Sequence, residues 1–192
     1  GSAGTRTKYT ISVWVKRGKL GVNESIISAG TGYNNSCQIS FNGADDRLYW
    51  NSYSNNGANY DYFLSPTRRF RDPSAWYHIV CAFDSTQGTS SNRQKIYING
   101  VQETAFTTAT YSSQNYADYA FNNILHEIGD DVANGSKFFN GSMSHFHGVD
   151  GTAYPASTFG STDATTGEWK INTSPSVTYG NNGFFILKDG NT

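Results

Sequence analysis

The chain has 192 residues, a formal net charge of −1, and charged side chains at only 15% of its positions. This length suits a single domain with a sizeable core, and the near-neutral charge, without a dense basic stripe, argues against nucleic-acid binding. No apolar run approaches the ~18 residues that a membrane span needs.

The first third of the chain reads as short strands separated by polar turns. Residues 9–16 alternate between apolar and polar side chains, which predicts a strand with one buried face. Residues 25–29, 37–41 and 47–52 are the next predicted strands, and Asn42-Gly43 closes a hairpin between the last two. The residues that follow, up to position 61, read as a polar connection with interleaved tyrosines.

The stretch that organises the chain covers residues 76–103. Residues 79–83 (Ile-Val-Cys-Ala-Phe) are apolar on both faces, which is typical of a central strand buried on both sides. After a polar loop, residues 94–99 alternate, and Asn99-Gly100 supplies the two positive-φ residues of a type I′ turn. We therefore expect a buried strand followed by a tight hairpin.

The second half of the chain gives weaker strand signals. Residues 106–121 form another Tyr-, Ser-, Thr- and Asn-rich stretch, and residues 123–129 and 137–149 are predicted strands. Residues 155–159 suit a single helical turn, and the sequence is then loop-like until a last strand at residues 184–187. Without a helix of ordinary length, the chain is predicted to be all-β, a jelly-roll β-sandwich of two antiparallel sheets.

Several of these strands carry motifs, among them ISVWVK, WYHIVCAFD, KIYINGV, HEIGDD and FFNGSMSHF. In this order and at these spacings they resemble the laminin-G-like branch of the concanavalin A-like lectin/glucanase superfamily, over roughly residues 9–159. The tail, beginning FHGVDGTAYPASTFG, resembles segments that follow such modules in virion proteins of marine bacteriophages. Together the two resemblances imply a concanavalin A-like sandwich at an extracellular or virion surface.

The expected organisation is one domain. We expect residues 1–4 to be a cloning remnant, and residues 5–192 to form the laminin-G-like sandwich, with residues 160–192 as a C-terminal extension packed on it. Cys37 and Cys81 both fall in predicted strands and are expected to be buried free thiols, with a disulfide between them as the alternative.

The catalytic signals are weak. Glucanases of the resembling superfamily carry three acids at alternate positions of one strand, whereas Glu127 and Asp131 here flank Gly129 at the position of the middle acid. On a regular strand the outer pair lies roughly 13 Å apart, and retaining glycosidases need carboxyl groups about 5–5.5 Å apart. We therefore predict that the protein is not an enzyme.

Two histidines raise the question of a transition metal. His145 and His147 are two positions apart on a predicted strand and share a face with Met143, so a third ligand from a neighbouring strand could complete a site. The alternative, which we favour, is that His147 packs or hydrogen-bonds within the sheet while His145 is half exposed. His78 matches the core histidine of the resembling family, which implies a structural role.

Relatives in the resembling family often hold one calcium ion at the sandwich rim through Asp and Asn oxygens. Asp130, Asp131 and Asn134 lie in one turn with Gly135 and are the candidate metal ligands. The alternative is that acids and asparagines occupy turns because they bend and cap the backbone. Calcium is the one cofactor that the sequence suggests.

The binding prediction depends on tyrosine, of which the chain has 13, many in Asn-, Ser- and Gly-rich stretches. A tyrosine offers a flat apolar face and a hydrogen bond at low entropic cost, which suits sugar rings and protein partners. The candidate ligand-binding residues are Tyr49, Trp50, Tyr53, Tyr60, Tyr62, Tyr111, Tyr116 and Tyr119. Alternatively, these rings pack against each other across strands or against a neighbouring subunit.

The sequence favours a non-catalytic recognition module, a glycan-binding or host-attachment domain of a viral surface or appendage protein. Its expected partner is a glycan or a host cell-surface polysaccharide. The second hypothesis is a purely structural virion module, for decoration or oligomerisation, that contacts other virion proteins or further copies of itself. The third is a degenerate glycosidase around Glu127 and Asp131.

Overall fold

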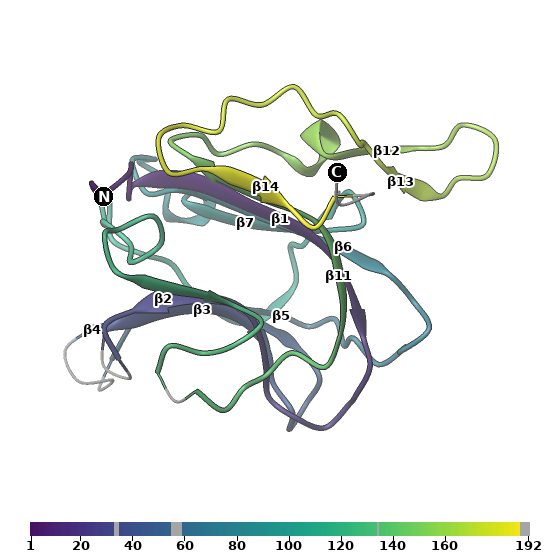
Figure 1. Ribbon diagram of the computed structural model, residues 1–192, viewed down its shortest axis with the longest axis horizontal. Helices are drawn as coiled ribbons and strands as arrows, with labels where there is room; N and C mark the ends of the chain where they lie inside the picture. The colour runs from purple at the N-terminus through teal and green to yellow at the C-terminus, as the bar shows by residue number, and fades with distance from the viewer. Residues whose placement is uncertain (33–34, 55–58, 134, 189–192) are drawn as a thin grey trace.

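The computed structural model describes residues 1–32, 35–54, 59–133 and 135–188, which form two six-stranded antiparallel sheets packed face to face (Figure 1). Sheet A has the strand order β14-β11-β1-β6-β7-β8, and sheet B has the order β10-β2-β3-β4-β5-β9. Helix in the described chain is limited to two single 3₁₀ turns, Ser90–Asn92 and Ala156–Thr158. The prediction of an all-β sandwich is confirmed.

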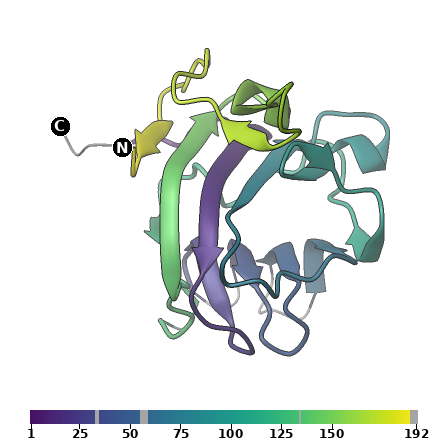
Figure 2. The same cartoon turned by 90° about the vertical axis from the view of Figure 1, so that its right-hand side faces the viewer.

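Sheet A consists of β1 (Lys8–Arg17), β6 (Tyr77–Asp84), β7 (Gln94–Ile98), β8 (Val101–Gln102), β11 (Gly141–Asp150) and β14 (Phe184–Ile186). Sheet B consists of β2 (Glu24–Gly30), β3 (Ser36–Phe41), β4 (Leu48–Ser54), β5 (Asn59–Pro66), β9 (Phe106–Thr110) and β10 (Leu125–Ile128). The ten-residue strands β1 and β11 pair along their length and curve together through the molecule (Figure 2).

The core lies between the sheets because successive side chains of a strand point to opposite faces. Val13 and Val15 of β1 are fully buried there, opposite Ile39 and Trp50 from sheet B, which are 3% and 1% exposed. Cys81 of β6 lies in the same core, and it and Cys37 are free thiols.

One end of the core contains a buried ion network. The guanidinium of Arg17, fully buried, donates to Glu24 Oε2 at 2.9 Å, to Asp46 Oδ1 at 3.2 Å and to the Phe70 carbonyl at 2.9 Å. A buried charge is tolerated only when it is paired and hydrogen-bonded. This network therefore ties β1 and β2 to the turn that joins β3 and β4.

The outer face of sheet A is covered by the C-terminal segment, which crosses it as an extra layer (Figure 1). Within that segment, β12 (Gly160–Thr162) pairs with β13 (Trp169–Ile171). Val80 of β6 packs there against Phe159, and Trp169 Nε1 donates to Nδ1 of the buried His78 at 2.9 Å. β6 is thus apolar on both faces because both are covered, as expected.

The hairpin between β7 and β8 has the predicted turn. Asn99 and Gly100 have φ angles of 48° and 82°, as a type I′ turn requires. A Cβ at Gly100 would lie 2.4 Å from the Trp169 ring, so the turn also leaves room for the C-terminal layer.

Four strands were not expected from the sequence: β5, β9, β12 and β13. β5 starts within the expected polar connection, since its first residues, Asn59 and Tyr60, are exposed and only its second half turns apolar side chains inward. β9 is an edge strand with mostly exposed side chains, so it lacks the alternation that a buried face imposes.

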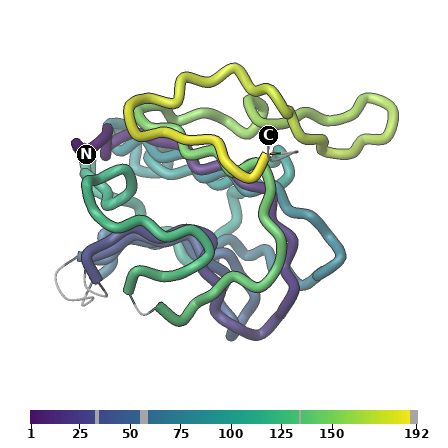
Figure 3. Tube along the Cα trace, in the orientation of Figure 1, coloured from purple at the N-terminus to yellow at the C-terminus, as the bar shows by residue number. Residues whose placement is uncertain are grey.

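The N-terminal residues lie beside the loop that precedes β10 (Figure 3). The amide of Gly4 donates to the Phe121 carbonyl at 2.7 Å, and Arg6 Nε donates to the Asp118 carbonyl at 2.6 Å. These bonds place the start of the chain at the edge of the sandwich, between the two sheets.

Candidate functional site

The outer face of sheet B carries a row of polar side chains. Glu127, Ser28, Gln38 and Asn51 stand opposite one another across β10, β2, β3 and β4. Their strand neighbours Ile39 and Trp50 point into the core, so these four side chains point away from it. We call them the polar row.

An array of aromatic rings in contact with one another borders the polar row on β4 and β5. Ring centroids are 4.8 Å apart for Tyr49 and Phe63, 4.7 Å for Phe63 and Tyr60, and 4.5 Å for Tyr60 and Tyr53. Tyr60 is the most open of them, at 42% exposure. We call these four residues the aromatic ladder. It offers flat apolar faces beside hydrogen-bonding groups.

Asn51 is the notable member of the polar row. It is 0% exposed, and neither its amide nitrogen nor its amide oxygen has a hydrogen-bond partner among the described residues. Burying an amide without a partner costs about 1–3 kcal/mol. Buried Glu127 Oε2, at the other end of the row, has no hydrogen-bond partner in the described chain either.

The turn after β10 covers the other side of the polar row, and the loop that contains it runs beneath sheet B in Figure 1. Ser28 Oγ donates to the Asp130 carbonyl at 3.0 Å, and Lys137 Nζ lies 3.2 Å from Gln38 Oε1. The same ammonium pairs with the carboxylate of Asp131 at 2.6 Å. The polar row thus lies between an ion pair and the aromatic ladder.

Three of the eight residues predicted to bind a ligand lie on this face: Tyr49, Tyr53 and Tyr60. Trp50 and Tyr62, also predicted to bind a ligand, do not lie on this face. Both point into the core, at 1% and 0% exposure, and their rings contact each other at 5.7 Å. The reason is strand alternation, which turns every second residue of β4 and β5 inward.

The remaining three, Tyr111, Tyr116 and Tyr119, pack against the core from the loop before β10. Tyr116 donates its hydroxyl to Asp61 at 2.8 Å, and Tyr119 donates to Asn35 at 3.1 Å. Burial, with the nearby charge of an aspartate, raises the pKa of Tyr116. These hydroxyls hold the loop to the sandwich.

An unexpected acid lies beneath that loop. Asp118 is fully buried and accepts hydrogen bonds from the hydroxyls of Tyr9 and Tyr62 at 2.5 and 2.7 Å. Burial raises the pKa of its carboxyl group. The run Tyr-Ala-Asp-Tyr reads as an exposed loop, so this core acid could not be predicted from the sequence.

The turn proposed to bind calcium uses its acids internally. Asp131 is 1% exposed and pairs with Lys137, and Asp130 accepts the Asp131 amide at 2.7 Å. Asn134 lies outside the described residues. The described members of the turn do not fit a calcium ion, because the ion would have to displace a lysine. No cluster of three His, Cys, Asp or Glu side chains occurs among the described residues.

The rings of His145 and His147 both contact Phe185, at 5.7 and 4.0 Å between centroids, so the two histidines share a face as expected, but Met143 does not share it. A bulge interrupts the pairing of β11 with β1 between Ser144 and His147, and His145 has a φ of 47°. Met143 consequently packs toward the core, whereas His147 faces the C-terminal layer and bonds to the Tyr179 hydroxyl at 2.8 Å. His145 is 4% exposed rather than half exposed. His147 packs and hydrogen-bonds as favoured.

Comparison with known proteins places the chain in a family. The model of the concanavalin A-like lectin/glucanases superfamily matches residues 2–156. No curated protein matches the chain. In the described residues no helix is long and apolar enough to cross a membrane.

Three solved structures with the same fold are similar to this one. The IT-sialidase CBM40 of Ruminococcus gnavus has a TM-score of 0.54 at 15% identity, over 74% of this chain and 77% of that one. Domain 4 of the arabinanase AbnA from Geobacillus stearothermophilus has a TM-score of 0.55 at 19% identity, over 81% of this chain and 65% of that one. The heptameric SAP-like pentraxin of Limulus polyphemus has a TM-score of 0.58 at 16% identity, over 98% of this chain and 83% of that one. Because the family match spans most of its length, this chain belongs to the concanavalin A-like lectin/glucanase superfamily.

Proposed function

We propose that this domain is a non-catalytic glycan-recognition module whose binding surface is the outer face of sheet B. The observation that carries the proposal is the aromatic ladder beside the polar row, in which the ring of Tyr60 is 42% exposed and stacks on Phe63. A sugar ring has apolar C–H faces that stack on aromatic rings and hydroxyls that both donate and accept.

The fold neighbours support the ligand class. The Ruminococcus gnavus module also has structures bound to α2,3- and α2,6-sialyllactose, and the arabinanase domain was solved with arabinotriose. The acidic side chains of this face are consistent with recognition without catalysis. Asp131 is buried and paired with Lys137. It therefore cannot act on a bound ligand as a second carboxylate together with Glu127.

The charge of the face favours a neutral glycan. Glu127 brings a carboxylate to one end of the polar row, and the nearby cation, Lys137, is already paired with Asp131. An anionic sugar would meet Glu127 without a cation to balance it. We therefore expect neutral oligosaccharides to bind better than sialylated ones.

The resemblance of the tail to segments of bacteriophage virion proteins supports a place at a virion surface, where the module would attach to host polysaccharide. An extracellular setting agrees with that role.

One feature favours the alternative of an oligomerisation module. Apolar side chains along the edge strand β10 and after it are exposed, namely Leu125 (58%), Ile128 (39%) and Phe138 (66%).

A glycan array followed by calorimetry tests the proposal. Tyr60→Ala, which removes the most exposed ring of the ladder, is expected to weaken binding about tenfold, equal to ~1.4 kcal/mol. The matched control is Trp76→Ala, since Trp76 is an aromatic residue of equal exposure (40%) just before sheet A strand β6. The affinity for the glycan should be the same in the presence of calcium as in the presence of a chelator.

Two outcomes would contradict the proposal. One is that no neutral oligosaccharide binds, which would favour the oligomerisation module. The other is that Tyr60→Ala and Trp76→Ala weaken binding equally, which would place the ligand elsewhere on the molecule.

A further inference from the structure

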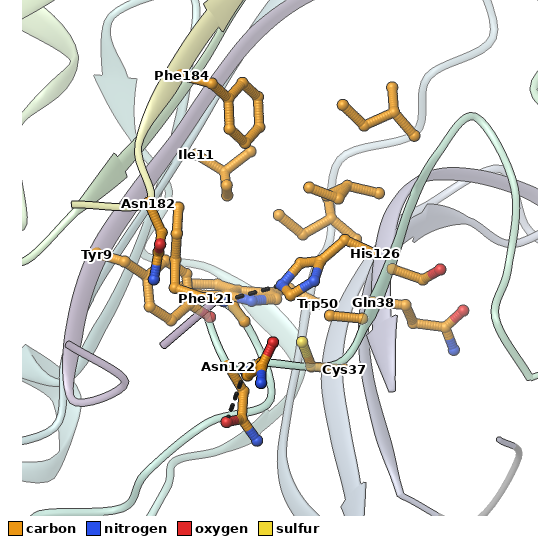
Figure 4. A pocket seen from close by; sticks show the side chains of 18 of the residues that line it. Tyr9, Ile11, Cys37, Gln38, Trp50, Phe121, Asn122, His126, Asn182 and Phe184 are labelled. Carbon is orange, nitrogen blue, oxygen red and sulfur yellow. Dashed lines mark hydrogen bonds between the residues drawn. The ribbon is translucent and has the colours of Figure 1, made fainter. Parts of the chain in front are cut away.

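A cavity of about 340 Å³ lies between the two sheets, on the side of sheet B opposite the aromatic ladder (Figure 4). Ile11 from β1, Phe184 from β14 and Trp50 from β4 are among its walls. It lies at the edge of the sandwich where the N-terminal residues meet the loop before β10. We call it the inter-sheet cavity.

The inter-sheet cavity is apolar inside and polar at its opening. Its interior side chains are buried: Tyr9, Ile11, Ala29, Ile39 and Trp50 are each at most 3% exposed. Toward solvent the lining becomes polar, with the carboxamides of Asn122, Asn123 and Asn182. None of the lining side chains is Asp, Glu, Lys or Arg, and the α-amino group of Gly1, an exposed residue beside Asn123, lies at the opening.

His126 forms one wall near the opening and is fixed as a neutral ring. Its Nε2 accepts the Phe121 amide proton at 3.0 Å, and its Nδ1 lies 2.9 Å from the Ile124 carbonyl (Figure 4 shows the first bond). A nitrogen that accepts an N–H bond carries no proton of its own, so the second nitrogen carries the single ring proton. The wall therefore adds no charge to the cavity.

The size of the cavity fits a small molecule. Protein interiors are close-packed, and voids larger than a few waters are uncommon. Small-molecule sites commonly measure about 300–1,000 Å³ and combine mostly apolar walls with few polar groups. An engineered apolar cavity of about 150 Å³ already binds benzene, and the volume here is about twice that.

We propose that the inter-sheet cavity binds a small, neutral, amphipathic molecule, with its hydrophobic body between Ile11 and Trp50 and a hydroxyl or carbonyl group at the asparagines of the opening. A fatty acid carboxylate would find no partner among the lining side chains, and only the exposed α-amino group of Gly1 at the opening could pair with it. A sugar fits poorly because the apolar walls would leave its hydroxyls unpaired. The cavity lies on the inner side of sheet B, although Ser28 and Gln38 of the polar row are among its lining residues, and the proposal does not depend on glycan binding.

Two dyes of similar shape test the charge preference. N-phenyl-1-naphthylamine is neutral, and 8-anilino-1-naphthalenesulfonate carries a sulfonate. The neutral dye is expected to bind saturably at one site with a rise in fluorescence, and the anionic dye at least tenfold more weakly. Equal affinities, or no saturable binding of the neutral dye, would overturn the proposal.

Substitutions locate the dye. Ala29→Leu adds three carbon atoms inside the cavity and should weaken binding of the neutral dye at least tenfold. Ile128→Asp places a charge at the opening, where Ile128 is 39% exposed and a polar change is compatible with folding. The control Val101→Asp makes the same kind of change on β8, at a side chain 62% exposed and outside the cavity, and should leave binding intact. Retained binding in both cavity variants would refute the assignment.

The thiols give an independent readout. Cys37 lines the cavity whereas Cys81 does not (Figure 4). In a Cys81→Ala background, a small neutral thiol reagent should modify Cys37 more slowly when the neutral dye is saturating. A modification rate that the dye leaves unchanged would contradict occupancy of the cavity.

Discussion

Replacing Asn51 with leucine should stabilise the protein, contrary to the usual effect of changing a buried residue. Leucine has the same branching at Cγ as asparagine but needs no hydrogen bonds. Because both amide atoms of Asn51 are buried without partners in the described chain, the substitution removes a penalty of about 1–3 kcal/mol. For a domain of this length, that gain raises the melting temperature by roughly 2–12 °C.

Urea unfolding of the parent protein and Asn51→Leu, at one pH and salt concentration, measures the change. Gln38→Leu is the matched control. Gln38 lies on the same face and is similarly buried, but its amide accepts a hydrogen bond from Lys137 at 3.2 Å, so its loss should bring no gain. A variant less stable than the parent would show that the amide is already bonded, for example to an ordered water, and would refute the reasoning.

Three further predictions concern the fold. Arg17→Met should cost about 3–5 kcal/mol in urea unfolding, because Glu24 would stay buried without its cation; a loss below 1 kcal/mol would contradict this. Burial lowers the pKa of His78 from its ordinary value of 6.5 to about 3. Between these two pH values, the His78 ring binds a proton in the unfolded chain but not in the folded protein. Stability should therefore fall as the pH drops from about 6.5 toward 3, by up to ~1.4 kcal/mol per pH unit, and His78→Gln should flatten the profile; an unchanged slope would refute the assignment. Gly100→Ala should destabilise the protein by about 1 kcal/mol or more through its positive φ, and should change the fluorescence of Trp169, which its Cβ would meet; unaltered stability and emission would count against it.

The central part of the fold could be predicted from the sequence because local chemistry dictates it. Residues 79–83 are apolar throughout and Asn99-Gly100 fits one turn type, so β6 and the β7–β8 hairpin follow directly. β5 could not be predicted in the same way. Its first residues, Asn59 and Tyr60, face solvent, and their strand conformation depends on pairing with β4, which is not a local property.

The candidate site was predictable only in part. Tyrosine content pointed to Tyr49, Tyr53 and Tyr60, but the division between outer face and core depends on strand register, and so Trp50 was wrongly placed. Asn51 gave no signal, because its place in the predicted strand at residues 47–52 does not reveal whether its amide is buried. Its importance comes from burial, which only the assembled sheet creates.

The most direct test of the glycan surface is a nuclear magnetic resonance titration of the isotope-labelled domain with the strongest neutral oligosaccharide from the array. The side-chain NH₂ signals of Asn51 and the ring signals of Tyr49 and Tyr60 should shift together and saturate with one affinity. Shifts confined to residues of sheet A or to the C-terminal layer, with the Asn51 signals unmoved, would contradict the account.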